Sequence, residues 1–312
     1  TKKRRSITEK IASFTVSRER RILPEDENMK KLAAAAGFVA LFALVSLSQQ
    51  MPKSNFTNFD KSKIHYYDIG NSKSRTAIVF IHGWTCSADF WKDSFNAFPQ
   101  NRVIAIDLVG HGQSDKPNAI YSMDFFAKSI DAVLTKEKIE KAVLVGHSMG
   151  TPVARQYYRL FPAKTAGIVI VDGSLRPFMS EEDFEKVFAP VRSNYVQNAP
   201  NFINGMLQPV KDTALRDWIR ERMLATRAPV ALSAMDGMGD PSIWGNDKMN
   251  VPVLAVMAES PSWKSDEEAF FKSIAPNLEF HMWKDASHFL MMEKPAEFNG
   301  LLKAFVAKHS LL

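Results

Sequence analysis

KAVLVGHSMGTPVARQYYRLF, residues 141–161, joins three local patterns in one stretch. It begins with an unbroken Val- and Leu-rich run, as expected of a strand that is buried on both faces. It ends with a helical pattern over 151–161, whose first turn tolerates Pro152. Between the two lies GHSMG, where glycines on either side of Ser148 allow a sharp turn. The stretch therefore predicts a strand–turn–helix corner with the Ser148 hydroxyl at the edge of a sheet.

Short apolar runs of the same kind recur from residue 55 onward. Most of them end in Gly, Asp or His, and amphipathic stretches separate them. One such stretch, 122–136, predicts a helix that Ser122 can cap. Strands that alternate with helices imply an α/β fold with a doubly wound, mostly parallel sheet. The predicted strands are 77–83, 102–108, 141–147, 166–173, 251–258 and 279–285.

The alternation of strands and helices stops between residues 174 and 250. Met- and Phe-containing segments at 181–188, 201–206 and 213–225 predict helices there. Ligands of open α/β sheets bind at the carboxyl ends of the strands. We therefore expect this insertion to form a helical cap over that edge. The expected domains are a core of 55–174 and 251–312 and a cap of 175–250.

Residues 1–48 differ from the remainder of the chain in charge and hydropathy. Ten Lys and Arg residues and five Asp and Glu residues lie within 1–31, so this tail carries five of the six net positive charges. Residues 32–45 are small or apolar and would span about 21 Å as a helix, less than the roughly 30 Å of a bilayer core. Lys30 and Lys31 precede this run and Ser46-Leu47-Ser48 follows it. That layout is typical of a secretory signal peptide.

We expect an exported protein, periplasmic or extracellular, whose translation starts at Met29. The alternatives are an uncleaved membrane anchor with a basic cytoplasmic tail, in line with the positive-inside tendency, and a cytoplasmic protein. The body of the chain has a single net positive charge, which argues against a nucleic-acid partner. The one cysteine, Cys86, excludes an intramolecular disulfide and is expected to be a packed side chain. The sequence does not indicate an oligomeric state.

Ser148 needs a base, because a serine hydroxyl is a poor nucleophile until its proton is removed. His288, in KDASHFLMMEKP, follows the last predicted strand, where such a base is expected. The other six histidines lie earlier in the chain, inside a strand run or in the terminal helix. A tetrahedral intermediate also needs N–H donors for its oxyanion. The backbone groups of Met149 and Trp84 are the expected donors.

Four motifs in this chain resemble those of the α/β-hydrolase superfamily and occur in the same order. They are HGW at 82–84, DLVGHGQSDKP at 107–117, GHSMG at 146–150, and SHF with ExP at 287–295. The resemblance covers roughly residues 55–312. It implies an eight-stranded sheet, a Ser–His–acid triad and a helical cap after the sixth strand. A serine at the turn argues against dehalogenases and epoxide hydrolases, which need a carboxylate nucleophile.

The triad acid is the point at which the chain departs from the family pattern. Most members carry an Asp in a G-x-x-D turn after the seventh strand, where this chain has AESP at 258–261. Asp172, which ends the predicted sixth strand, is the first substitute, because certain dehalogenases carry the acid there. Glu259, in the altered loop, is the second, and the third alternative is Asp266 or no triad acid at all.

The leading hypothesis is a serine hydrolase that cleaves small to medium apolar carboxylic esters through an acyl-enzyme. A lactonase, a carbon–carbon bond hydrolase or a cofactor-free haloperoxidase-like enzyme would use the same triad. A non-catalytic ligand sensor that kept the fold is the alternative outside enzymes. Neither a metal nor a cofactor is expected, and the expected partner is a small apolar ester. The expected pocket walls are Phe90, Trp91, Phe178, Met179, Trp263 and Phe289, beside Trp84.

Overall fold

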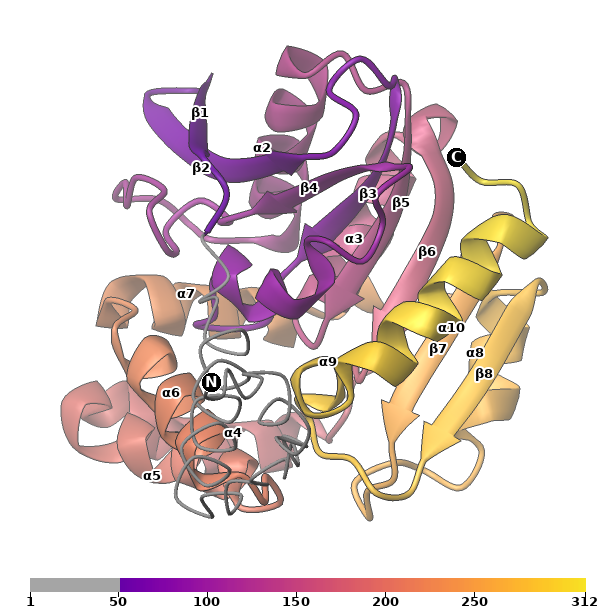
Figure 1. Cartoon of the computed structure of the whole chain (residues 1–312). Helices are drawn as coiled ribbons and strands as arrows, with labels where there is room; N and C mark the ends of the chain where they lie inside the picture. The colour runs from indigo at the N-terminus through magenta and orange to yellow at the C-terminus, as the bar shows by residue number, and fades with distance from the viewer. Residues whose placement is uncertain (1–50) are drawn as a thin grey trace, which may run out of the picture. The chain divides into compact units, whose positions relative to one another are not determined.

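Eight strands form one sheet in the order β1-β2-β4-β3-β5-β6-β7-β8 in the computed structural model, which describes residues 51–312 (Figure 1). β1 pairs antiparallel with β2, and β2 pairs antiparallel with β4. All other neighbours pair in parallel. The mostly parallel sheet predicted from the sequence is therefore confirmed. The strands are Ser54–Phe59 (β1), Ser62–Ile69 (β2), Thr76–Ile81 (β3), Arg102–Ile106 (β4), Lys141–His147 (β5), Thr165–Val171 (β6), Val253–Ala258 (β7) and Leu278–Trp283 (β8).

The central strands β3 to β7 are almost completely buried, as their Val-, Ile- and Leu-rich sequences predict. β8 lies at the edge of the sheet and is half-exposed, so burial on both faces does not extend to it. Several strands end two residues before the predicted boundary, for example β3 at Ile81 and β6 at Val171. The residues that end these apolar runs, such as His82 and Asp172, leave the sheet and enter the loops at its carboxyl edge.

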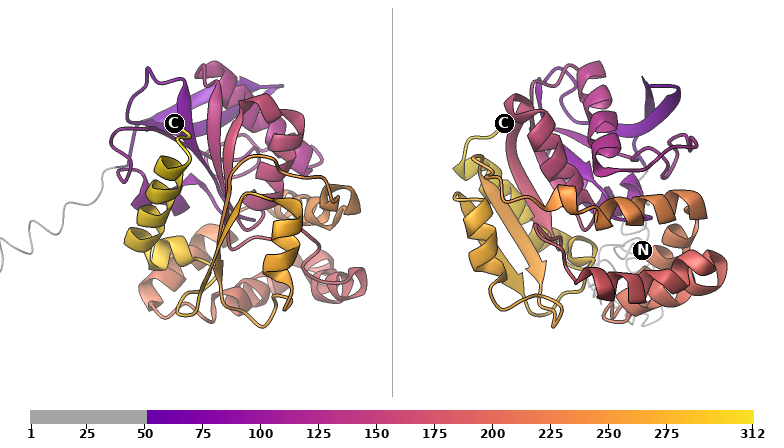
Figure 2. Two further views of the ribbon diagram at one scale, coloured as in Figure 1. Left: turned by 90° about the vertical axis from the view of Figure 1, so that its right-hand side faces the viewer. Right: turned by 180° about the vertical axis from the view of Figure 1, so that it is seen from behind.

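Helices cover both faces of the sheet. α2 (Met123–Lys136), α3 (Gly150–Leu160) and α8 (Glu267–Ile274) lie on one face, and α10 (Pro295–Lys308) lies on the other (Figures 1 and 2). α2 begins as predicted, because the Ser122 hydroxyl accepts a hydrogen bond of 3.2 Å from the Phe125 amide. The short elements are η1 (Ala88–Ser94), η2 (Pro162–Lys164) and α9 (Leu290–Glu293).

Four helices and a short 3-10 turn, η3 (Pro241–Trp244), connect β6 to β7. They lie together at the end of the sheet toward which the parallel strands point (Figure 1). We call residues 181–244 the helical segment. The sequence predicted α4, α5 and α6 but not α7, whose two glycines and small residues give only a weak helical pattern. The helices are Glu181–Ser193 (α4), Tyr195–Leu207 (α5), Thr213–Leu224 (α6) and Ala228–Gly239 (α7).

Residues 51–312 form one compact unit. Within this unit no helix combines the length and the apolar character needed to cross a membrane. The predicted basic tail, the signal-like run at 32–45 and the start at Met29 all lie outside the described residues.

Candidate active site

Ser148 lies at the turn between β5 and α3, as the sequence predicted. Its φ is +52°, in the left-handed region, which costs a residue with a side chain of the order of 1–3 kcal/mol. The Ser148 amide donates a hydrogen bond of 3.0 Å to the Val171 carbonyl, which fixes the turn against β6. A Cβ atom at Gly146 would overlap the Gly150 carbonyl, so only glycine allows strand and helix to approach this closely. The surrounding contacts therefore hold Ser148 in a strained conformation.

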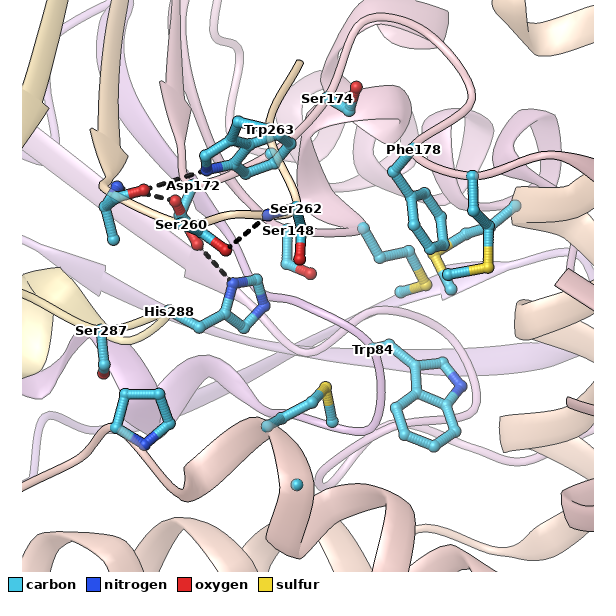
Figure 3. Close-up of a pocket in the computed structure, with 18 of the residues that line it drawn as sticks. Trp84, Ser148, Asp172, Ser174, Phe178, Ser260, Ser262, Trp263, Ser287 and His288 are labelled. Carbon is cyan, nitrogen blue, oxygen red and sulfur yellow. Dashed lines mark hydrogen bonds and ion pairs between the residues drawn. The ribbon is translucent and has the colours of Figure 1, made fainter. Parts of the chain in front are cut away.

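Asp172 and His288 meet beside this serine. His288 Nδ1 lies 2.6 Å from Asp172 Oδ2 (Figure 3), and Asp172 Oδ1 accepts a hydrogen bond of 2.8 Å from the Ala258 amide. A carboxylate at Nδ1 favours the tautomer with its proton on Nδ1, so the Nε2 lone pair is available to act as a base. Within residues 51–312 the Ser148 hydroxyl does not form a hydrogen bond with His288. Such bonds often tighten only when substrate is bound.

The other two candidate acids lie in different surroundings. The Glu259 side chain is exposed and forms no hydrogen bond with His288, while its backbone amide donates to the Trp283 carbonyl. Asp266 forms an ion pair of 2.6 Å with Arg176, and this hydrogen-bonded guanidinium holds the pKa of the Asp266 carboxyl below its usual value. Of the three carboxylates named from the sequence, the structure brings Asp172 to His288.

A cavity of about 480 Å³ opens beside these residues. This volume lies within the range of sites for small organic ligands. Ser148, Asp172 and His288 line it from the sheet edge, and the helical segment closes it from the other side. Five of the residues predicted for the oxyanion site and the walls also line it: Trp84, Met149, Phe178, Met179 and Trp263.

Three residues were wrongly predicted to line the cavity. Phe90, Trp91 and Phe289 do not line the cavity and are almost completely buried. The ring centroids of Phe90 and Phe289 are 6.0 Å apart, and Trp91 stacks on Phe80 at 4.7 Å. They belong to the core, because η1, α9 and α10 pack together there, and their apolar character alone could not distinguish core from pocket.

Trp84 and Met149, the predicted oxyanion donors, both line the cavity, and their donor role stays a prediction. Met149 directly follows Ser148 and precedes α3, whose N-terminus favours negative charge. The Trp84 indole Nε1 donates a hydrogen bond of 2.8 Å to the Ala231 carbonyl in α7. This bond links the loop after β3 to the helical segment.

His147 is a site residue that the sequence did not identify. Its Nε2 donates a hydrogen bond of 2.7 Å to the carbonyl oxygen of His288, and the two ring centroids are 4.7 Å apart. Burial, together with the nearby His288, lowers the pKa of His147 well below its ordinary value. A neutral His147 can therefore hold the His288 loop without adding a second positive charge. The sequence feature that could have identified His147 is its position directly before Ser148.

Asp107 explains the DLVGHGQSDKP motif. Its carboxylate is buried and accepts hydrogen bonds from the amides of Ala88 (2.7 Å) and Gln113 (2.8 Å) and lies 2.8 Å from His65 Nδ1. These bonds lower the pKa of Asp107 against the effect of its burial. The carboxylate thus fixes the loops after β3 and β4 at the same edge as Ser148.

Cys86 is a packed side chain of the core. Cys86 is buried, and burial raises the pKa of its thiol. This side chain therefore packs as predicted and is not poised to form a thiolate. Among residues 51–312, no cluster of three His, Cys, Asp or Glu side chains is arranged to hold a metal ion.

Comparison with known proteins identifies the family. The alpha/beta hydrolase fold family matches residues 76–231, which is half of the chain. The chain belongs to this family, so it is an α/β hydrolase, as the four motifs indicated. The predicted fold class is thereby confirmed.

Three proteins similar to this chain have different descriptions. A non-heme chloroperoxidase of Streptomyces lividans is 37% identical over 130 residues, which is 41% of this chain and 46% of that protein. The structure of Est816, described as an N-acyl homoserine lactone degrading enzyme, has 26% identity and a TM-score of 0.69, covering 81% of this chain and 100% of Est816. The esterase EaEST from Exiguobacterium antarcticum has a TM-score of 0.73 at 18% identity, covering 82% and 100%. The similarity to EaEST, at 18% identity, shows a shared fold and nothing more specific.

Proposed function

We propose that this α/β hydrolase cleaves carboxylic esters through an acyl-enzyme. Ser148 is the nucleophile, His288 the base and Asp172 the triad acid. The observation that carries the proposal is the 2.6 Å contact between Asp172 and His288 beside the cavity that the strained Ser148 lines. The proposed nucleophile, base and base-orienting group thus all line one cavity.

The chemistry follows from these positions. His288 Nε2 takes the Ser148 proton while Ser148 Oγ attacks the ester carbonyl carbon. The amides of Met149 and Trp84 donate hydrogen bonds to the oxyanion. His288 then returns the proton to the departing alcohol oxygen, which leaves the acyl group on Ser148. Water enters, gives a proton to His288 and releases the carboxylic acid, and Ser148 recovers its proton.

A lactonase is the second candidate, because a lactone is a cyclic ester and needs the same steps. The similarity to Est816, at 26% identity over 81% of this chain, favours it. In a lactone the leaving alcohol stays attached to the acyl group. The two candidates therefore differ in the shape of substrate that the cavity admits.

Hydrolysis of a panel of alkyl esters and lactones, followed by acid release at constant pH, tests the proposal. We expect ester hydrolysis with an initial burst of alcohol that is stoichiometric with the enzyme if deacylation is slower than acylation. Ser148→Ala should lower kcat for ester hydrolysis by a factor of the order of 10⁶ if the triad acts as a unit. An ester hydrolysis that is unchanged in Ser148→Ala would contradict the proposal. Faster turnover of lactones than of open esters would favour the second candidate.

A further inference from the structure

The cavity beside Ser148 has two sides of different chemical character. From this difference we infer that the substrate is an ester of a flexible, straight-chain fatty acid with a small, hydroxylated alcohol that carries no negative charge. The inference rests on the proposed ester hydrolysis and names its substrate class. It also assigns each half of the ester to one side of the cavity.

The first side is apolar and comes mainly from the helical segment. In Figure 3, Phe178 and Trp84 lie on one side of Ser148, away from Ser260 and Ser287. Methionine contributes much of this wall, and its unbranched, polarizable side chain adapts to flexible apolar ligands. A straight hydrocarbon chain fits such a wall better than a rigid or polar group. We call this the acyl side, made of Phe178, Met179, Phe188, Phe202, Met206 and Met238.

The second side comes from the loops after β7 and β8, which add polar groups beside the apolar Pro261 and Trp263. Glu259, Ser260, Ser262 and Ser287 line it, and we call it the alcohol side. Ser260 Oγ accepts a hydrogen bond of 3.2 Å from the Ser262 amide, which leaves the Ser260 proton free to be donated. The Ser262 hydroxyl has no hydrogen-bond partner among residues 51–312.

Charge on the alcohol side restricts the alcohol further. The Glu259 carboxylate is exposed at the cavity and forms no ion pair with any Lys, Arg or His of residues 51–312. An anionic alcohol would be repelled by this carboxylate. Free hydroxyls on the two serines and an acceptor carboxylate match the hydroxyl groups of a neutral polyol.

The position of His288 decides the direction in which the ester lies. His288 must return a proton to the leaving alcohol oxygen, so the alcohol has to leave on the side of His288. Ser260 and Ser287 lie on that side of Ser148 in Figure 3. The acyl chain then extends in the other direction, under the helical segment. The geometry thus points to the alcohol on the serine-lined side and the fatty acyl chain on the methionine-lined side.

A pair of isomers tests this direction. Ethyl octanoate and octyl acetate contain the same atoms, but the long chain is on the acyl half in one and on the alcohol half in the other. Burial of each methylene is worth roughly a fourfold gain in kcat/KM. We expect kcat/KM to be at least roughly tenfold higher for ethyl octanoate than for octyl acetate. For 1-octanoylglycerol we expect a further rise of about threefold over ethyl octanoate, because its free hydroxyls contact the alcohol side. Equal rates for the isomers, or faster hydrolysis of octyl acetate, would overturn the inference.

Matched variants locate the two sides. Met206→Trp should fill the acyl side and lower the ratio of kcat/KM for ethyl octanoate over ethyl butanoate by roughly tenfold. Met282→Trp is its control, because Met282 is exposed on β8 and does not line the cavity. Ser262→Ala should reduce the preference for 1-octanoylglycerol over ethyl octanoate by about threefold. A Met206→Trp variant with a native melting temperature and an unchanged ratio would contradict the assignment.

The two proposals can fail separately. If the wild-type protein cleaves no ester and a fluorophosphonate leaves Ser148 unmodified, the proposed function fails and the substrate class fails with it. If esters are cleaved but octyl acetate is preferred, only the substrate class fails.

Discussion

Two residues at the site adopt a backbone conformation that side chains disfavour. The φ angles of Ser148 and Asp172 are +52° and +43°. Both residues follow a buried parallel strand, and both amides donate to a carbonyl of the neighbouring strand, Val171 or Val256. Strain of this kind persists only where the surrounding structure determines it, and it concentrates at functional sites. The backbone thus aims the nucleophile and the proposed triad acid toward His288.

The identity of the triad acid can be tested by comparing two isosteric substitutions. Asp172→Asn should lower kcat by about 10⁴-fold, because the amide no longer favours the required imidazole tautomer. Glu259→Gln, which removes the other candidate carboxylate, should lower kcat by less than tenfold. Steady-state kinetics on one ester gives both values. A larger loss in Glu259→Gln than in Asp172→Asn would exchange the two assignments.

His147 should act as a positioning residue through its hydrogen bond to the His288 carbonyl. His147→Phe keeps a planar ring but loses the donor, and we expect kcat to fall by roughly tenfold with little change in KM. His147→Gln can still donate and should recover most of that loss. If both variants match the wild-type kcat, the bond does not position His288.

His111 should make the protein less stable in mild acid. Burial lowers the pKa of His111 to about 3, while an unfolded chain has a value of about 6.5. Below pH 6.5 the unfolded chain therefore binds a proton that the folded protein does not, so the free energy of unfolding decreases as the pH falls. This group contributes about 2 kcal/mol of that decrease between pH 7 and pH 5. Urea unfolding at several pH values should show a shallower dependence in His111→Leu, and an unchanged dependence would contradict this account.

At the scale of elements, α3 connects the nucleophile to both ends of the helical segment. Arg155 in α3 is buried and donates to the Leu175 carbonyl at 2.9 Å, just before the segment. It also donates to the carbonyl of Gly245 and contacts Asp247, just after the segment. Burial lowers the pKa of Arg155 to about 10, so it stays charged at neutral pH. One side chain thus ties the walls of the cavity to the helix that follows Ser148.

Arg155→Met should therefore destabilise the protein by about 3 kcal/mol, because the carbonyl of the buried Leu175 and that of Gly245 lose their donor and a buried charge is removed. Arg155→Lys keeps the charge but lacks the forked donor geometry, and we expect an intermediate loss. Chemical denaturation measures both values. If Arg155→Met is as stable as the wild type, the hydrogen bonds of Arg155 contribute nothing to the stability of the protein.

The sequence predicted elements well where apolar periodicity was strong and poorly where it was weak. The central strands and α2 and α3 are found close to their predicted bounds, because buried parallel strands and amphipathic helices leave clear patterns. β1 and β2 were not predicted from the apolar runs. β1 is a half-exposed antiparallel strand at the sheet edge, and β2, although it lies inside the sheet and is largely buried, contains several polar residues. α7 was missed because its small residues and two glycines give only a weak helical pattern.

For the whole molecule, the sequence predicted the family and the order of the motifs, and the structure brings distant residues together. The contact between Asp172 and His288 spans 116 residues of sequence, and the sequence placed Asp172 before Glu259 only by resemblance to certain dehalogenases. In the same way, Phe289 and Trp263 have similar apolar character, yet one lies in the core and the other at the cavity. These choices depend on packing between elements, which composition and spacing do not encode.

The central claim is that Ser148 is a nucleophile activated by His288, and covalent labelling tests it most directly. The purified protein would be treated with a fluorophosphonate, and the modified peptide would be identified by mass spectrometry. We expect a single phosphonyl adduct on Ser148, strongly slowed labelling in His288→Ala and none in Ser148→Ala. An intact, folded protein that stays unlabelled, or one that is labelled equally well in Ser148→Ala, would contradict the account.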